Sequence, residues 1–171
     1  MRLPARLLTV VQVEAKLERL GLVLPGPVRA PEGARLPFAF ARFDGRHVYL
    51  SGHGPQARDG SLAGPRGKVG AEVSVEEAYE AARATGLSIL GTLQRELGDL
   101  DRVSRWLRVF GMVNSAPGFA EQPSVINGFS DLILELYGPE AGQHARSAVG
   151  MAELPFGISV EIEAEVALDQ R

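Results

Sequence analysis

Apolar and polar residues alternate most clearly near the C-terminus, where the pattern predicts a β-strand over Ile158–Leu168. The alternation puts Ile158, Val160, Ile162, Ala164 and Val166 on one face and Ser159, Glu161, Glu163 and Glu165 on the other. The small, apolar segment Arg146–Ala152 precedes this strand, and Leu154-Pro155-Phe156-Gly157 separates the two. We predict two strands paired as a hairpin, with the apolar face of the second strand buried.

Helical spacing appears in two longer segments. Ser74 is followed three residues later by Glu77, a capping box that predicts a helix running to about Leu97. Gly86 and Gly91 inside this helix indicate a close contact with the sheet. The predicted buried stripe is Ala78, Ala82, Thr85, Ile89, Leu93 and Leu97.

The remaining elements follow from turn residues and local apolar runs. Pro123 suits the first turn of a second helix, which Gly138-Pro139 should end. Asp44-Gly45 predicts a hairpin turn, because glycine adopts positive φ without steric cost. The predicted strands of this part of the chain are Phe38–Phe43, His47–Ser51 and Val103–Val113.

The N-terminal part of the sequence differs in character. Thr9–Leu20 has the spacing of a short amphipathic helix, whereas the prolines of Leu24–Gly33 exclude regular structure. We therefore expect an N-terminal helix and proline-rich linker over residues 1–33 and one domain over residues 34–171. Met1–Val13 is partly apolar, but it lacks a cleavage site and we read no targeting signal in it.

The predicted order is β-β-α-β-α-β-β, with both helices amphipathic. One mixed sheet carrying two helices on a single face, a two-layer α+β sandwich, is the simplest arrangement that buries both apolar helix faces. At 171 residues the chain is long enough for one such domain.

Composition narrows the classes of function. The formal net charge of −3 and the scattered arginines argue against a nucleic-acid partner. The absence of cysteine excludes disulfides and thiolate chemistry, and three histidines without metal-ligand spacing predict no metal site. No segment has the roughly 20 apolar residues that cross a bilayer, so we expect no membrane partner and a cytoplasmic location.

Two charged residues of the C-terminal strands are candidates for chemistry. A guanidinium at Arg146 binds a carboxylate bidentately, and a carboxylate at Glu161 can handle a proton or a water. In a hairpin the two side chains would converge on one pocket. The alternative is a solvated ion pair worth less than about 1 kcal/mol, the usual role of such residues and of Glu163 and Glu165.

Three motifs resemble the RidA family, also called YjgF or L-PSP endoribonuclease. The first is Arg-Ser-x-Val-x-x-x-x-Leu-Pro from Arg146, followed by the strand containing Val-Glu-Ile-Glu-Ala. The second is His47–Pro55, similar to that family's strand ending in Ser-Gly-Gln-x-Pro, and the third is Asn127 in the second helix. The resemblance implies the chorismate-mutase-like fold, a homotrimer, and three ligand clefts between subunits.

The resemblance also implies site residues. The ligand-binding candidates are Arg146, Ser51, Gly52, His53, Asn127, Ser147 and Phe38, and the catalytic candidates are Glu161 and Arg146. Two positions depart from the family: Phe38 stands where deaminases carry a tyrosine, and Ala148 where a cysteine is common. His53 replaces a glutamine; a lone histidine at a loop edge is more often structural or solvated than catalytic, and the other expectation is that it titrates near neutral pH.

Three functions are compatible with these residues. The leading hypothesis, from the resemblance, is cofactor-independent hydrolysis of 2-aminoacrylate-type enamines and imines to 2-keto acids and ammonia. Arg146 would clamp the substrate carboxylate and Glu161 would activate water. The second is a trimer that binds a small carboxylate or a 2-imino or 2-keto acid without turnover. The third, ribonuclease activity, is disfavoured by the acidic balance of the chain.

Overall fold

The computed structural model describes residues 12–170. In chain order its elements are α1 (Val13–Arg19), β1 (Ala41–Asp44), β2 (His47–His53), α2 (Val75–Leu97), the 3₁₀ turn η1 (Leu100–Arg102), β3 (Val103–Asn114), α3 (Gln122–Gly142), β4 (Ala145–Met151), the 3₁₀ turn η2 (Pro155–Gly157) and β5 (Val160–Leu168). After α1 the order is β-β-α-β-α-β-β, as predicted.

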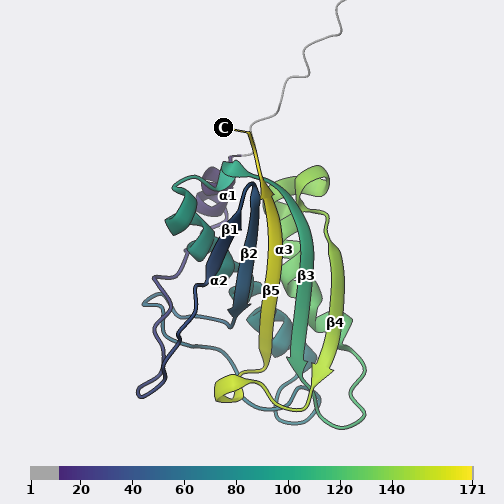
Figure 1. The fold of residues 1–171 in the computed structure, drawn as a ribbon. Helices are drawn as coiled ribbons and strands as arrows, with labels where there is room; N and C mark the ends of the chain where they lie inside the picture. The colour runs from purple at the N-terminus through teal and green to yellow at the C-terminus, as the bar shows by residue number, and fades with distance from the viewer. Residues whose placement is uncertain (1–11, 171) are drawn as a thin grey trace, which may run out of the picture.

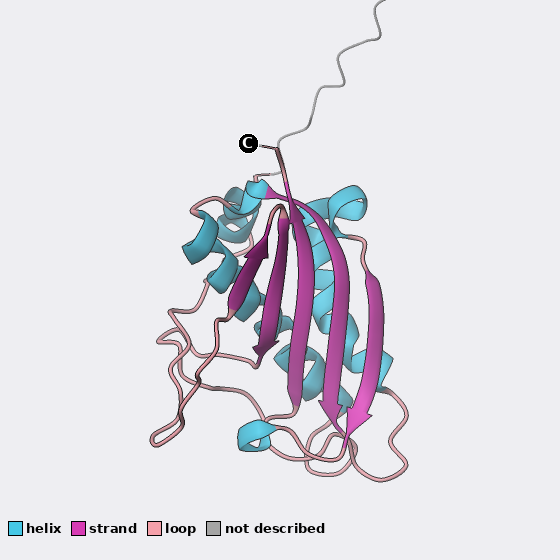
Figure 2. Ribbon diagram, in the orientation of Figure 1, coloured by secondary structure: helices cyan, strands magenta, loops and turns pink. Residues whose placement is uncertain are grey.

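The five strands form one mixed sheet in the order β1-β2-β5-β3-β4, in which only the β3–β4 pair is parallel. The two long helices α2 and α3 lie behind the sheet in Figure 1, and Figure 2 shows the same two layers. We call the opposite face, which no described helix covers, the open face. The predicted two-layer α+β architecture is confirmed.

Local sequence signals set the ends of α2. Ser74 accepts a hydrogen bond from the Glu77 amide at 3.1 Å, and the Glu77 carboxylate accepts one from the Ser74 amide at 2.9 Å. The helix ends at Gly98, whose φ of 76° is left-handed and favours glycine. The capping box and the stop after Leu97 are therefore confirmed.

The glycines inside α2 make close contacts, but not with the sheet as predicted. A Cβ at Gly86 would lie 2.8 Å from the Leu132 side chain of α3, and one at Gly91 would lie 3.0 Å from the Pro25 carbonyl oxygen. Gly86 thus lets α2 and α3 approach each other, and Gly91 lets the proline-rich segment cross α2. The two glycines thus indicated close contacts correctly, but not the partners.

The second long helix begins with Pro123 in its first turn, as predicted. At Gly138 the backbone is non-helical, with φ 73°, and a further turn ends at Gly142. The predicted stop at Gly138-Pro139 is therefore a break inside α3. Its apolar side packs on the sheet, where the rings of Phe129 and the buried Trp106 of β3 lie edge to face at 5.6 Å.

The N-terminal helix α1 joins the same core, because Val13 and Leu17 are buried in it. The helix predicted over Thr9–Leu20 is observed from Val13, while residues 9–11, like most of the apolar Met1–Val13 segment, lie outside the described residues. The division of the chain at residue 34 stays a prediction. Within residues 12–170, no helix has the length and apolarity needed to cross a membrane.

The two C-terminal strands do not form the predicted hairpin. Both β4 and β5 pair with β3, which lies between them. Residues 152–159 cross the end of β3, where Leu154 and Ile158 pack on Met112 in a second small apolar cluster. Burial of these side chains therefore stabilises a crossing over β3 rather than a tight turn. The predicted burial of the apolar face of β5 is confirmed.

Candidate functional site

Arg146 lies near the start of β4, and its side chain reaches toward α3. Its Cα is paired with that of Val109, which is buried in the core beneath the helices. The Nη1 atom donates to Asn127 Oδ1 and to Ser130 Oγ, both at 2.9 Å. Asn127 and Ser130 are three residues apart, so they lie on the same side of α3 and face β4 together.

These contacts leave one edge of the Arg146 guanidinium free. Nη1 carries two hydrogens, and the two bonds to α3 use both. Nη2 makes one long contact of 3.5 Å with the Pro123 carbonyl oxygen, and Arg146 forms no salt bridge with any described carboxylate. Among the described residues, nothing accepts from Nε–H or from the second Nη2–H, and the Nε–Nη2 edge is the arrangement of donors that binds a carboxylate bidentately.

Glu161 lies near the start of β5 on the open face. Its Cα is paired with that of Met112, and its carboxylate lies over Gly52 of β2, where a Cβ would be 1.9 Å from Glu161 Oε1. Burial, and secondarily the neighbouring charge of Glu163, raises the pKa of Glu161. A half-buried carboxylate with a raised pKa is suited to general-base chemistry near neutral pH.

The strand β2 is irregular next to Glu161. Its register with β5 shifts between Leu50 and His53, so Ser51 and Gly52 form a bulge. Ser51 donates its hydroxyl to the Ala39 carbonyl oxygen at 2.8 Å. Just before that residue, the Phe38 ring is 51% exposed. The bulge, the exposed ring and the carboxylate thus lie at the same end of the sheet.

His53 ends this bulge but turns its ring toward the helices. The side chain is buried, with Nδ1 2.6 Å from the Ser51 carbonyl oxygen and Nε2 2.9 Å from Thr92 Oγ1 of α2. Burial lowers the pKa of His53 to about 4. The expectation that His53 titrates near neutral pH is therefore wrong, and its ring packs between Thr92 and Phe40.

The candidate residues thus form two groups, which we name half-sites. The arginine half-site contains Arg146, Asn127 and Ser130, and the glutamate half-site contains Glu161, Ser51, Gly52 and Phe38. Ser147, exposed and next to Arg146 in β4, points to the open face, because neighbouring strand residues alternate.

The two half-sites are separate within one chain. Arg146 pairs with Val109 of β3, and Glu161 pairs with Met112 of the same strand. Because these two β3 positions are an odd number of residues apart, their side chains point to opposite faces of the sheet. Two strand spacings and three residues put the Cα atoms of Arg146 and Glu161 about 14 Å apart. The prediction that a hairpin brings the two side chains into one pocket of the same chain is therefore wrong.

Sequence reasoning missed two residues of the arginine half-site region. Ser130 bonds Arg146, and His144 Nε2 lies 3.0 Å from Ser130 Oγ. Ser130 could have been identified from its position one helical turn after the candidate Asn127, which puts both side chains on the same side of the helix. His144 is two residues before Arg146, a spacing that by itself indicates no contact.

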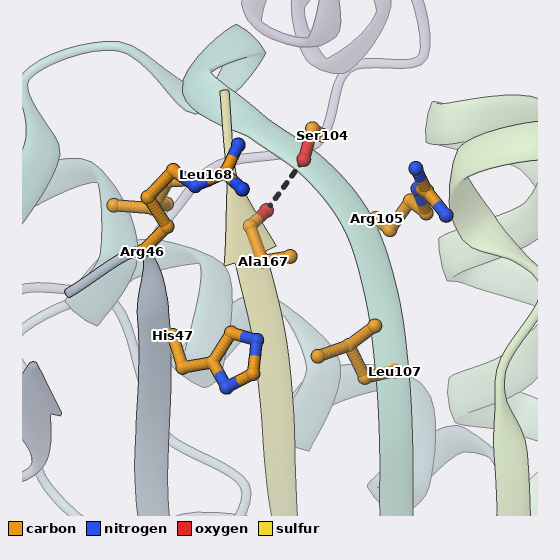
Figure 3. A pocket seen from close by; sticks show the side chains of 7 residues that line it. All are labelled: Arg46, His47, Ser104, Arg105, Leu107, Ala167 and Leu168. Atoms are coloured by element: carbon orange, nitrogen blue, oxygen red, sulfur yellow. Dashed lines mark hydrogen bonds between the residues drawn. The ribbon is translucent and has the colours of Figure 1, made fainter. Parts of the chain in front are cut away.

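A hollow on the open face lies at the far end of the sheet from Glu161. Its volume is about 230 Å³, and Figure 3 shows it between the ends of β2, β5 and β3. In this view the head of Arg46 extends toward β5, the head of Arg105 lies beyond β3 and points away from the hollow, and His47 and Leu107 flank β5 near Ala167. The lining residues are Arg46, His47, Ser104, Arg105, Leu107, Ala167 and Leu168, none of which belongs to either half-site.

One group of acidic residues has the proximity of metal ligands. Carboxylate oxygens of Glu14, Asp99 and Asp101 lie within 4.8 Å of one another. Each carboxylate already accepts a backbone hydrogen bond, from Leu100, Asp101 and Val13 respectively, at 2.8–2.9 Å. These bonds tie α1 to η1, so the group has a structural role and neither half-site offers a comparable set.

Comparison with known proteins places this geometry in a family. The model of the YjgF/chorismate mutase-like endoribonuclease family matches residues 14–160. Protein TCP17 of Trypanosoma cruzi is 43% identical over 158 residues, covering 92% of this chain and 95% of TCP17.

Two crystal structures extend the similarity to three dimensions. Atu1372 of Agrobacterium tumefaciens, a protein of unknown function, has a TM-score of 0.81 and 38% identity, with 94% of each chain covered. An endoribonuclease-type protein of Shewanella oneidensis MR-1 has a TM-score of 0.82 and 30% identity, with 92% of this chain and 99% of that chain covered. The chain therefore belongs to the YjgF/chorismate mutase-like family, the family that the motifs around Ser51 and Arg146 resemble.

Proposed function

We propose that this protein is an enamine/imine deaminase, which hydrolyses 2-aminoacrylate-type intermediates to 2-keto acids and ammonia. The observation that carries the proposal is the pairing of chemistries in the two half-sites. One presents a guanidinium edge with two free donors, and the other presents a half-buried carboxylate with a raised pKa. A carboxylate substrate and a water molecule are the ligands that this pair fits.

Arg146 binds the substrate carboxylate in this proposal. Because Asn127 and Ser130 occupy both Nη1 hydrogens, the Nε–Nη2 edge is fixed in direction before the substrate arrives. Pre-organisation of this kind lowers the entropic cost of binding. The positive charge also favours substrates that carry a carboxylate beside the reacting carbon, as 2-imino acids do.

Glu161 activates the water. The enamine takes up a proton from solvent at its terminal carbon and becomes an iminium ion (C=NH2+), whose carbon is electrophilic without a cofactor. Glu161 accepts one proton as water adds to that carbon, and it returns the proton to nitrogen, which becomes –NH3+. The C–N bond then breaks, ammonia leaves with the bonding pair, and the second water proton returns to solvent as the C=O bond of the keto acid forms.

The proposal requires two copies of the chain at each site, because Arg146 and Glu161 of one chain lie about 14 Å apart on opposite faces of the sheet. The Tyr49 side chain, 44% exposed, lies on the open face of β2 and is available for contact between copies. We propose a homotrimer of about 55 kDa with three clefts between copies. Light scattering at micromolar concentration tests this, and a monomer would contradict it.

Binding without turnover is the second candidate, and Phe38 favours it. The phenyl ring of Phe38 in the glutamate half-site supplies an apolar wall but no hydroxyl donor to orient a substrate or water. Arg146 would then hold a small carboxylate metabolite and Glu161 would serve only as a polar neighbour. The same experiment separates the two candidates.

The experiment measures the loss of 2-aminoacrylate generated in situ by a serine dehydratase, together with release of ammonia and keto acid. Wild type should accelerate the loss, and Glu161→Gln should reduce the rate by at least about 100-fold, because the amide cannot accept a proton. Glu165→Gln is the matched control, since this residue lies on the same face of β5 and pairs with Arg108 at 3.4 Å. Wild type without any acceleration would leave the binding protein as the better account.

A further inference from the structure

A chain of hydrogen bonds extends from Arg146 into the junction between α3 and β4. Ser130 Oγ lies 2.9 Å from Arg146 Nη1 and 3.0 Å from His144 Nε2. The other ring nitrogen, His144 Nδ1, lies 2.7 Å from the Gly142 carbonyl oxygen. Four groups are thus linked in series: Arg146 of β4, Ser130 in the middle of α3, His144 of the connection and the carbonyl group at the end of α3.

The chemistry of these groups fixes the direction of donation. A carbonyl oxygen only accepts, so His144 Nδ1 carries a hydrogen and the neutral ring accepts at Nε2. A guanidinium only donates, so Ser130 Oγ accepts from Arg146. The hydroxyl hydrogen of Ser130 is then free to point at His144 Nε2. Each donor in the series has an acceptor, and the hydroxyl is satisfied on both sides.

The surroundings of His144 favour the neutral ring that this arrangement needs. Burial lowers the pKa of His144 and the Arg146 charge lowers it further, against the opposing effect of the bond to Gly142. The ring is also packed edge to face against Phe129, with centroids 6.0 Å apart. The acceptor at Nε2 is therefore held in one place by packing as well as by the bond from Nδ1.

We propose that Ser130 and His144 are positioning residues for Arg146. His144 orients the Ser130 hydroxyl, whose oxygen holds Nη1, so that the Nε–Nη2 edge faces the substrate carboxylate. The identity of the ligand, a substrate carboxylate, rests on the proposed function, whereas the positioning of the Arg146 guanidinium by Ser130 and His144 does not. Without the series, Asn127 alone would hold Nη1 and the guanidinium would gain rotational freedom.

Matched variants separate the hydrogen bonds from packing. Ser130→Ala removes the hydroxyl and Ser130→Thr keeps it. His144→Phe keeps a ring against Phe129 but has no acceptor, whereas His144→Gln restores an acceptor near the position of Nε2. Ser88→Ala is the control, because the Ser88 hydroxyl bonds the Ala84 carbonyl of its own helix at 3.1 Å and no other group of residues 12–170.

Two readouts distinguish positioning from a merely structural role. Nitrogen-15 NMR reports whether the two Nη groups of Arg146 give separate signals, as they do when rotation of the guanidinium is restricted. The signals are assigned to Arg146 because they disappear in Arg146→Lys. Calorimetry gives the Kd for pyruvate. Ser130→Ala and His144→Phe should merge the Nη signals and weaken pyruvate binding about 2- to 10-fold, the range for one lost hydrogen bond. Ser130→Thr, His144→Gln and Ser88→Ala should match wild type in both.

The outcomes separate this inference from the proposed function. Wild-type Nη signals in Ser130→Ala, or equal behaviour of His144→Phe and His144→Gln, would overturn the positioning role even if pyruvate binds. If no protein binds pyruvate but the Nη signals still merge in the two disruptive variants, the positioning role stands and the carboxylate ligand is wrong. A second ¹⁵N measurement, on the His144 ring, should find the hydrogen on Nδ1, and a hydrogen on Nε2 would overturn the proposed direction of donation.

Discussion

Substitution of Gly52 by alanine tests the position of the Glu161 carboxylate. An alanine Cβ would lie 1.9 Å from Glu161 Oε1 and 2.8 Å from its Cδ, whereas ordinary contacts begin at 3.4 Å. The carboxylate must therefore retreat by about 1.5 Å, and a misplacement of about 1 Å can cost about 100-fold in rate. We expect Gly52→Ala to lower turnover of enamine about 100-fold.

The fold should tolerate this change. Gly52 does not have a left-handed φ, and the atoms that must move are the far end of a flexible side chain. The free energy of unfolding should change by no more than about 1 kcal/mol. Because Arg146 is unaffected, the Kd for pyruvate should stay within a few-fold of wild type, so the loss should appear in kcat rather than in binding.

The assay compares enamine turnover, pyruvate Kd and urea unfolding for wild type, Gly52→Ala and a control glycine. Gly26→Ala serves as the control, since its Cβ would meet nothing closer than 3.5 Å and its φ is not left-handed. Wild-type turnover in a stably folded Gly52→Ala would refute the reasoning, because it would show that chemistry does not depend on a carboxylate held over this glycine.

Three further predictions concern charge. Arg146→Lys should weaken pyruvate binding about 10- to 100-fold by calorimetry, because one ammonium cannot reproduce the planar pair of donors, whereas Arg108→Lys should leave it unchanged. Glu163→Gln removes a like charge that helps raise the pKa of Glu161, so the decline of kcat/KM at acid pH should begin at lower pH than in wild type. If the decline does not move, it reports the protonation of a group other than Glu161. Burial lowers the pKa of His53 from 6.5 to about 4, so the unfolded chain binds the proton first as pH falls. The free energy of unfolding should therefore decrease by about 3 kcal/mol between pH 6.5 and 4 because of His53. Urea titrations of His53→Gln over the same pH range should lack this part of the decrease.

Local signals predicted the elements of the fold well. The reciprocal bonds of Ser74 and Glu77 depend on residues three apart, and the Asp44-Gly45 turn needs only the positive φ that Gly45 adopts, 58°. The alternation in β5 likewise follows from one buried face. These features are encoded within a few residues, so a single sequence is sufficient to find them.

Pairing and contacts between distant residues were not predictable in the same way. Nothing between Met151 and Val160 distinguishes a turn that pairs β4 with β5 from a crossing over β3, because the crossing is stabilised by Met112, far away in sequence. The same holds for Gly86: a glycine inside a helix indicates that another element approaches closely, but not which element that is.

The candidate site was predicted by resemblance rather than by spacing. The motifs singled out Arg146 and Glu161, but their placement on opposite faces depends on the register of β3 with both strands. The ring of His53 could not be placed from sequence either, because its burial depends on the contact with Thr92 of α2.

Mixing two inactive variants tests most directly the claim that each site is shared by two copies. Arg146→Lys and Glu161→Gln chains, each of low activity alone, are unfolded together, refolded in equal amounts and assayed for enamine turnover. If each site takes Arg146 from one copy and Glu161 from the next, about one quarter of the sites in randomly mixed trimers carry both native residues, and activity should return to about that fraction of wild type. Activity no higher than the average of the two separate variants would contradict the shared site.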